Sequence, residues 1–385
     1  MKDLSIFFSP AEIPTEIKEQ SLGNSIVVYT PGDFPVMKKG GVALIHVPEY
    51  RGIKNSNFST QKEHFRAHLY DLHPNVGWDF QVYDLGTILQ GNEKSDTWFA
   101  VQSVVEELVK NDIFPLIIGG AQDLTVPLYR GYKALEQMVN VCTIDNQLDL
   151  GNYEEEIHSE GYLSHLLFDR PCYLFNCANI GLQIPFASNA EFDLFDKLYF
   201  DVCRLGEFNA DFKKAEPHLR NADILSIDLN SIKASELNSE SYLSPNGFFA
   251  HQICQIAYYA GISDKLTSAG IFNYFPEAKP GILSSLTAQI VWYLMDGFAQ
   301  RKGDFPVGSK KNYTRFTVHV ESSNEDLVFF KSNRSDRWWL EVSYPGQKGS
   351  EYERHHMVPC DKDDYERAMQ NEIPDLWWKT YQKLM

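Results

Sequence analysis

The sequence ILSIDLNSIK, residues 224–233, is the segment from which the fold of this chain can be inferred. It begins as an apolar run and ends in polar side chains, as expected for a buried strand that leaves its sheet at a functional edge. Asp228 and Asn230 are two residues apart, so an extended chain directs both side chains to the same face. Two carboxylates at this spacing would suit a divalent cation, but here the second side chain is an amide. The segment therefore predicts a strand end of the metal-binding kind, in which an amide replaces one carboxylate ligand.

Seven further apolar runs have the length of β-strands: 42–47, 81–85, 115–118, 141–145, 173–179, 198–203 and 266–272. The stretches that carry apolar residues at helical spacing are 94–111, 124–139, 160–169, 246–261 and 282–300. Near-continuous apolar strands separated by helices indicate a parallel sheet covered on both faces. Such a pattern predicts a large doubly wound α/β domain or a barrel, with functional residues at the carboxyl ends of the strands.

The pattern changes along the chain and predicts three parts. Residues 1–40 are expected to be an irregular N-terminal segment, and residues 41–300 the α/β domain. Three strand-like runs with turn-like gaps then follow: 314–320, 326–331 and 337–344. They predict an antiparallel meander, and the charged stretch 361–385 predicts a terminal helix. Residues 301–385 are therefore expected to form a small β-rich appendage with a helix, which could bind a protein partner or support a homo-oligomer.

Composition excludes several classes of function. The formal net charge of −17 argues against nucleic-acid binding, which needs clustered Lys and Arg to neutralise phosphates. The six cysteines form no CxxC pair, so buried free thiols in a reducing compartment are expected. The apolar run at the N-terminus is too short for a secretory signal, and no segment approaches a membrane span. A cytoplasmic protein without membrane insertion is predicted.

Two other segments have the character of functional strand ends. In IIGGAQDLT, residues 117–125, a buried strand leaves through two glycines into a helix. In TIDNQLDL, residues 143–150, the side chains of Asp145, Gln147 and Asp149 would share one face if the strand continued. That arrangement would suit a chelate, so both segments are candidates for the same site as residues 224–233.

Together the three segments resemble the ureohydrolase superfamily of arginase, agmatinase and formimidoylglutamase. That family carries Gly-Gly-Asp-His, Asp-Ala-His-x-Asp and Ser-x-Asp-x-Asp-x-x-Asp segments in the same order and at similar separations. The resemblance covers residues 40–300, leaves the C-terminal part outside, and is closest to formimidoylglutamase-like sequences. It implies an arginase-like, three-layer α/β/α fold with a parallel sheet of about eight strands.

The resemblance also implies where a metal centre would lie. Members of the family hold two manganese ions with two His and four Asp side chains, and a bridging hydroxide attacks a guanidino or formimino carbon. Carried over position by position, the ligands correspond to Gln122, Asp145, Gln147, Asp149, Asp228 and Asn230. Three carboxylates are kept, while both imidazoles and one carboxylate are replaced by amides. The metal motifs are degenerate.

Three further residues take on meaning from the resemblance. Asn273 stands where the family usually presents a Glu that grips the cationic group of the substrate. For His158 two interpretations stay open, the counterpart of a catalytic His of arginases or an ordinary loop histidine. Lys233 falls at the last Asp of the third family segment, so charge compensation of the remaining carboxylates is hypothesised for it.

These residues leave two functions to be weighed. The favoured one is a formimidoylglutamase-like protein that has lost the dimanganese site and C–N hydrolase activity, needs no cofactor, and serves in binding or assembly. The alternative is a divergent metal-dependent hydrolase that uses manganese and acts on a linear amidine or guanidino substrate such as formimidoylglutamate. Amide carbonyls can ligate hard cations, which keeps that alternative open.

Overall fold

The protein is described here by a computed structural model that covers residues 2–14, 16–54, 63–275, 278–321, 325–344 and 352–385. Its main element is an open sheet of ten strands within these ranges, in the order β1-β4-β3-β5-β10-β9-β6-β7-β8, with β2 beside β4. The strands are β1 (Phe8–Ser9), β2 (Val27–Val28), β3 (Val42–His46), β4 (Val82–Ile88), β5 (Phe114–Ile118), β6 (Val139–Ile144), β7 (Leu174–Leu182), β8 (Asp201–Arg204), β9 (Ile224–Asp228) and β10 (Ser268–Phe272).

The sheet confirms the predicted α/β architecture and excludes the barrel. All eight predicted strands pair in parallel, and only the short β1 runs antiparallel, beside β4. Every residue of the central strands β3, β5, β6, β9 and β10 is buried. Their near-continuous apolar sequences follow from this, because helices cover both faces of the sheet.

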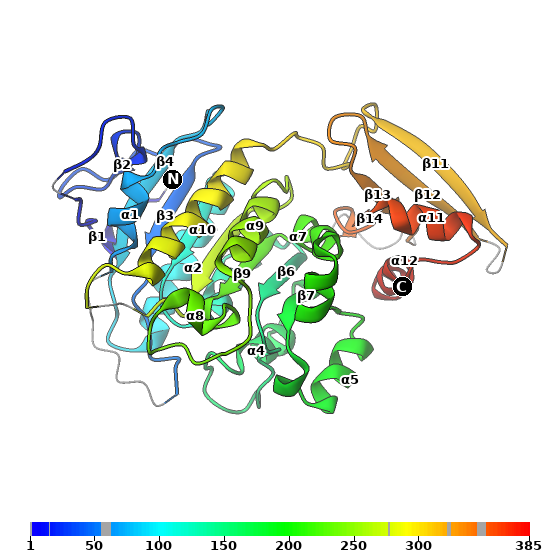
Figure 1. Cartoon of the computed structure of the whole chain (residues 1–385), viewed down its shortest axis with the longest axis horizontal. Coiled ribbons are helices and arrows are strands. Elements are labelled where there is room, and N and C mark those ends of the chain that lie inside the picture. The colour runs from blue at the N-terminus through cyan, green and yellow to red at the C-terminus, as the bar shows by residue number, and fades with distance from the viewer. Residues whose placement is uncertain (1, 15, 55–62, 276–277, 322–324, 345–351) are drawn as a thin grey trace.

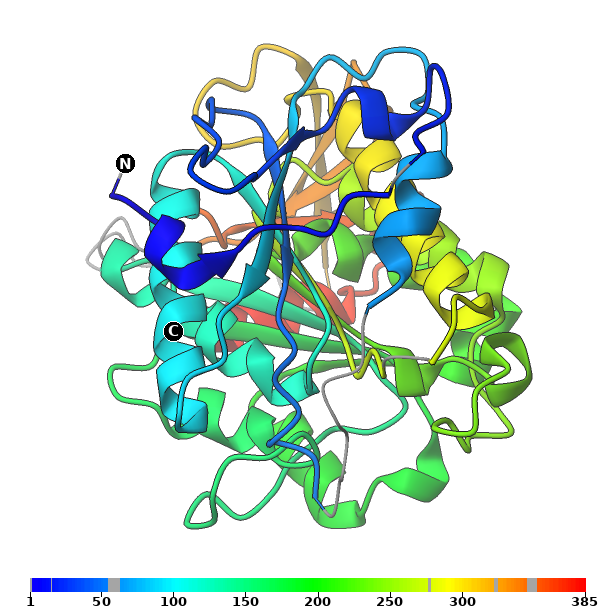
Figure 2. The same cartoon turned by 90° about the vertical axis from the view of Figure 1, so that its left-hand side faces the viewer.

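Two hydrophobic cores lie on the two faces of the sheet. One contains side chains of α1 (Phe65–Asp71), α9 (Ala250–Gly261) and α10 (Ile282–Ala299). The other contains side chains of α2 (Lys94–Lys110), α3 (Thr125–Arg130) and α4 (Tyr162–Phe168). Figure 2 shows α2 on one side of the sheet and α1 with α10 on the other. The remaining helices of this part are α5 (Asn189–Lys197), α6 (Leu205–Ala210), α7 (Glu216–Asn221) and α8 (Ala234–Leu237).

One predicted helix is shorter than its apolar pattern suggested. The stretch 124–139 forms α3 and then a single 3₁₀ turn, Lys133–Leu135, before β6 begins at Val139. Glu136 ends that turn in the left-handed region, at φ 51°. A helix cannot continue through such a residue, so the apolar side chains beyond it belong to the strand.

The C-terminal part is a separate four-stranded antiparallel sheet, β11 (Tyr313–Val320), β12 (Glu325–Ser332), β13 (Trp338–Glu341) and β14 (Met357–Cys360), in that order. Two helices follow, α11 (Lys362–Met369) and α12 (Asp375–Leu384), where the sequence predicted one. Asn371 adopts φ 68°, and Pro374 precedes the first residue of α12, so the helix is interrupted between them. The boundaries drawn at residues 40 and 300 stay a prediction.

The appendage lies beside the amino ends of β7 and β8 (Figure 1). Lys379 on α12 donates to the backbone carbonyl of Phe200 and to Asp201, the first residue of β8. Lys383 donates to the side chain of Asn176 near the start of β7. The carboxyl ends of the strands lie at the opposite edge. In the described part of the chain, no helix is long and apolar enough to span a bilayer.

Candidate functional site

Four strand ends meet at the carboxyl edge of the sheet, because β5, β10, β9 and β6 are neighbours in that order. Gln122 follows β5, Asp145 follows β6, Asp228 ends β9 and Asn273 follows β10. All four side chains are buried. The structure therefore brings together the strand-end positions that the sequence singled out, on strands that are far apart in the chain.

Two glycines at the end of β5 allow the backbone there to lie close to neighbouring segments of the site. Gly119 and Gly120 both have positive φ, and a Cβ on Gly120 would come within 2.7 Å of the carbonyl oxygen of Val47. A side chain there would be strained as well as crowded, so glycine is required. The carbonyl of Gly120 then accepts a hydrogen bond of 2.7 Å from the backbone N–H of Asn273.

Amide side chains hydrogen-bond the buried carboxylates. Gln122 Nε2 donates to Asp145 Oδ2 at 2.6 Å, and Asn273 Nδ2 donates to Asp228 Oδ1 at 2.8 Å. The backbone N–H of Gln122 donates to Asn273 Oδ1 at 3.2 Å and links the two pairs. Carboxylate oxygens that accept such bonds are satisfied by protein donors.

Asp149 is the third carboxylate of the group, and its pKa is raised well above the ordinary value. Burial is the main cause, and the charges of Asp145 and Asp228 add to it. Burial also raises the pKa of Asp145, although a hydrogen bond from Asp149 and others from backbone and Gln122 oppose the shift. The pKa of Asp228 is raised well above normal by burial and by the charge of Asp145. Burial therefore raises the pKa of all three aspartates, and the neighbouring carboxyls add to the shift for Asp149 and Asp228.

Gln147 and Asn230 lie at the border of this group and are half-buried. The backbone N–H of Gln147 donates to Asp145 Oδ1 at 2.9 Å. The backbone N–H of Asn230 donates to Asp228 Oδ1 at 2.8 Å, and its side-chain amide lies 3.5 Å from Asp228 Oδ2. Both residues thus contact the expected carboxylates chiefly through main-chain donors.

Sequence reasoning missed two members of the site. The hydroxyl of Tyr162, on α4, accepts a hydrogen bond from Gln122 Nε2 at 3.2 Å. Asn179, on β7, donates to the carbonyl of Gln147 at 2.7 Å. Tyr162 stands in an amphipathic helix and Asn179 in a buried strand, so neither carried a signal that distinguished it from a packing residue.

His158 and Lys233 lie apart from the three carboxylates. His158 Nε2 is 3.9 Å from Glu155, and burial lowers the pKa of this histidine. It lines a pocket of about 210 Å³ together with residues of the loop after β3 and with Lys94. The ammonium of Lys233 lies 5.1 Å from the ring centroid of Phe249. Within the described residues no ion pair joins Lys233 to the aspartates, so the structure offers no contact for the hypothesised charge compensation.

The donor set at this edge does not match a two-manganese centre. Both imidazole positions carry glutamines, and the Gln122 amide nitrogen points at a carboxylate oxygen that a metal would use. The described residues contain no group of three His, Cys, Asp or Glu side chains arranged to hold a metal ion. The arrangement can hold protons and hydrogen bonds, and amide groups donate to its carboxyl oxygens.

Comparisons with known proteins agree with the fold. The model of the Arginase family matches residues 57–296. A search of curated proteins finds no match for the sequence.

Several solved structures are similar to the protein. A Trypanosoma cruzi formiminoglutamase with Mn²⁺ has a TM-score of 0.61 at 16% identity, over 70% of this chain and 97% of that one. The formimidoylglutamase of Bacillus subtilis has a TM-score of 0.61 at 15% identity, over 76% and 95%. An arginase from Medicago truncatula has a TM-score of 0.54 at 16% identity, over 66% and 86%.

Proposed function

The chain belongs to the arginase family, and we propose that it is a formimidoylglutamase-like member without the two-manganese centre and without C–N hydrolase activity. One observation carries the proposal: Gln122 and Asn273 donate hydrogen bonds to Asp145 and Asp228. The carboxylate oxygens that metals would need are thereby engaged by amide nitrogens. An amide N–H is a donor only and cannot serve as a ligand.

The chemistry of hydrolysis supports the same conclusion. Attack on an amidine carbon near neutral pH needs a hydroxide that a fixed, Lewis-acidic metal generates. At this site both positions at which the family has an imidazole ligand carry glutamines, Gln122 and Gln147. Without imidazole ligands a bridged pair of ions is held less firmly. The remaining role of the protein would be in binding or assembly.

A second candidate is a divergent hydrolase with a weakly held, oxygen-ligated ion. It rests on the convergence of Asp145, Asp149 and Asp228, which interact closely enough to shift each other's pKa. Oxygen ligands of this kind suit hard cations such as magnesium, calcium or manganese. On this alternative the amide hydrogen bonds would have to be exchanged for metal contacts.

We also propose a cytoplasmic location and an interaction role for residues 301–385. All six cysteines are free, which supports a reducing compartment. In the appendage, Met369 and Trp378 are at least half exposed. Large apolar side chains at a surface are candidates for contact with a protein partner or a second copy of the chain.

The test is metal loading together with activity. The unmodified protein should show no manganese-dependent rise in melting temperature and release no formamide from formimidoylglutamate. The triple variant Gln122→His, Gln147→His and Asn230→Asp restores the family ligands, so manganese should raise its melting temperature by several degrees, as binding to the folded state does.

A matched control replaces the same three residues by Ala. It removes the same three side chains without adding ligands and should not respond to manganese. Product release by the unmodified protein with added manganese would establish the second candidate and reject the first. Failure of the folded triple variant to bind manganese would show that more than these three ligands has been lost.

A further inference from the structure

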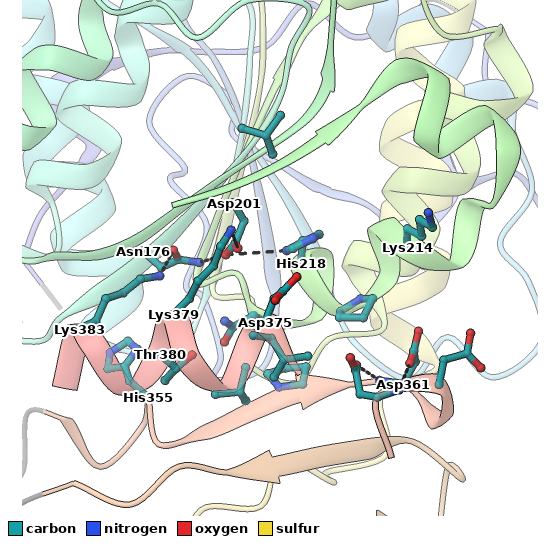
Figure 3. A pocket seen from close by; sticks show the side chains of 18 of the residues that line it. Asn176, Asp201, Lys214, His218, His355, Asp361, Asp375, Lys379, Thr380 and Lys383 are labelled. Carbon is teal, nitrogen blue, oxygen red and sulfur yellow. Dashed lines mark hydrogen bonds and ion pairs between the residues drawn. The ribbon is translucent and has the colours of Figure 1, made fainter. Parts of the chain in front are cut away.

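A cavity of about 330 Å³ lies between the amino edge of the large sheet and the appendage, opposite the family site. One wall comes from the starts of β7 and β8 and from α7, the other from β14, α11 and α12 (Figure 3). Its size is that of a pocket for a small molecule. Because residues of both parts form it, this pocket exists only in the assembled chain.

The inner end of the pocket has more positive than negative charge. Lys379 and Lys383 both approach Asp201, and Lys379 Nζ lies 3.1 Å from Asp201 Oδ1. Among the described residues, Lys383 Nζ donates one hydrogen bond, to Asn176 Oδ1. Two ammonium groups therefore face one carboxylate, and a carboxylate of a ligand would restore the balance.

A buried acceptor without a partner also lines the pocket. His355 is 2% exposed and its Nε2 lies 3.0 Å from the carbonyl of Met138, to which it donates. Its Nδ1 has no hydrogen-bond partner among the described residues. A neutral imidazole whose Nε2 donates has an acceptor at Nδ1, but this nitrogen is enclosed by protein atoms, so it offers no contact to a bound molecule.

The outer end of the pocket is acidic. Asp375 lies one helical turn before Lys379 on α12, and both side chains line the pocket (Figure 3). Asp363, at the start of α11, adds a second exposed carboxylate. Four residues rise about 6 Å along the helix axis, so opposite charges are offered to a ligand at roughly that separation.

We propose that this pocket binds a dipeptide-sized zwitterion. Its carboxylate would face Lys379 and Lys383, and its ammonium would face Asp375. Two extended residues span about 7 Å, which matches the separation between the basic and acidic ends. The proposed site is independent of the carboxyl edge and of the presence or loss of a metal there.

The experiment is a calorimetric titration of the full chain with glycylglycine at up to about 10 mM, which reveals millimolar affinity. N-acetylglycine lacks the ammonium and glycinamide lacks the carboxylate, so each should bind at least tenfold more weakly. Asp375→Asn and Lys379→Met should each weaken glycylglycine binding by about tenfold, the effect of losing one charged contact of about 1.4 kcal/mol.

Asp326→Asn is the matched control, because Asp326 is an exposed carboxylate on β12 outside the pocket. It should bind glycylglycine like the unmodified chain. Asp375 is exposed, so its variant is expected to fold even where Lys379→Met does not. Absence of binding by the folded protein, equal binding of the two half-charged probes, or unchanged binding by Asp375→Asn would each overturn the proposal.

Discussion

Buried carboxylates at the two edges of the large sheet have pKa values that are shifted in opposite directions. At the carboxyl edge, Asp149 and Asp228 have raised pKa values, because burial and neighbouring carboxylates favour their protonated forms. At the amino edge, burial alone would raise the pKa of Asp201, but Lys383, His218 and Lys379 outweigh it and hold the pKa at about 2. Asp223 at the same edge is fully buried and lies 2.7 Å from Arg354.

The difference in pKa between the two edges follows from where the cationic side chains lie. Arg354, Lys379 and Lys383 all belong to the appendage, which supplies positive charge to the amino edge. At the carboxyl edge, amides of Gln122 and Asn273 take the place of cations. Amides satisfy hydrogen bonds but do not cancel charge, so the pKa values of Asp149 and Asp228 stay raised at this edge.

The largest expected effect follows from deleting residues 301–385. Deletion would uncover Phe175 and leave Asp223 and Asp201 without their appendage partners. We expect the loss to approach the whole stability of a domain, on the order of 5–15 kcal/mol. Soluble yield and circular dichroism of the truncated chain would measure it. A monodisperse, cooperatively melting product would show that the appendage is only an accessory.

A smaller loss of stability is expected from Arg354→Met, which removes one cation from the amino edge. Asp223 is completely buried and would keep one cation, Lys265 at 3.9 Å, beside the backbone N–H of Asn140 that donates to it at 2.8 Å. Since Arg354 is itself partly exposed, a loss of about 2–4 kcal/mol in the free energy of unfolding is expected. Urea denaturation would measure it. Arg315→Met, at an exposed position on β11, is the control and should change stability little.

Asp149→Asn should act in the opposite direction and stabilise the protein. A carboxyl with a raised folded pKa binds more protons in the folded state, so its contribution to stability falls as pH rises above its unfolded value. Removing it should add about 1–3 kcal/mol at pH 8 and progressively less toward pH 4. Asn also tolerates the φ of 49° that Asp149 adopts.

Asp201→Asn is the counterpart at the amino edge, and denaturation at several pH values would measure both variants. The lowered folded pKa of Asp201 contributes stability that is present above its unfolded value and is lost as pH falls toward 2. Its replacement should therefore destabilise the protein at neutral pH. Equal signs for the two variants would remove the distinction between the edges.

The smallest expected effect is that of Lys233→Met. The ammonium lies over the ring of Phe249 and is partly exposed, so its removal should change the free energy of unfolding by less than about 1 kcal/mol. Thermal melts from pH 5 to 9 would test this. A strong, pH-dependent loss would instead support charge compensation of Asp228 or Asp145 by this lysine.

The strands could be predicted because their signal is local. Runs such as 224–229 are apolar throughout, as strands buried on both faces must be. The strand β14 (Met357–Cys360) was missed, since four residues that include Pro359 give no strand pattern. The interruption at Asn371 was missed because a left-handed residue has only a weak sequence preference.

At the site, residue types could be predicted and contacts could not. The replacement of His by Gln122 is visible in the sequence, but its hydrogen bond to Asp145 depends on how β5 and β6 are placed in the sheet. The position of the appendage against the large sheet had no local sequence signal either, because the contacting residues Lys383 and Asn176 are 207 residues apart. Long-range charge pairing of this kind is a property of the fold and not of a short pattern.

The contact between α12 and the start of β8 has a consequence for biosynthesis. Lys379 follows Asp201 by 178 residues, so at roughly 5–20 residues per second the ribosome needs on the order of 10–35 s to deliver the lysine after the aspartate. During that interval α12 does not yet cover the amino ends of β7 and β8. The nascent chain should therefore depend most on chaperones after the large sheet has been synthesised and before the last helix emerges.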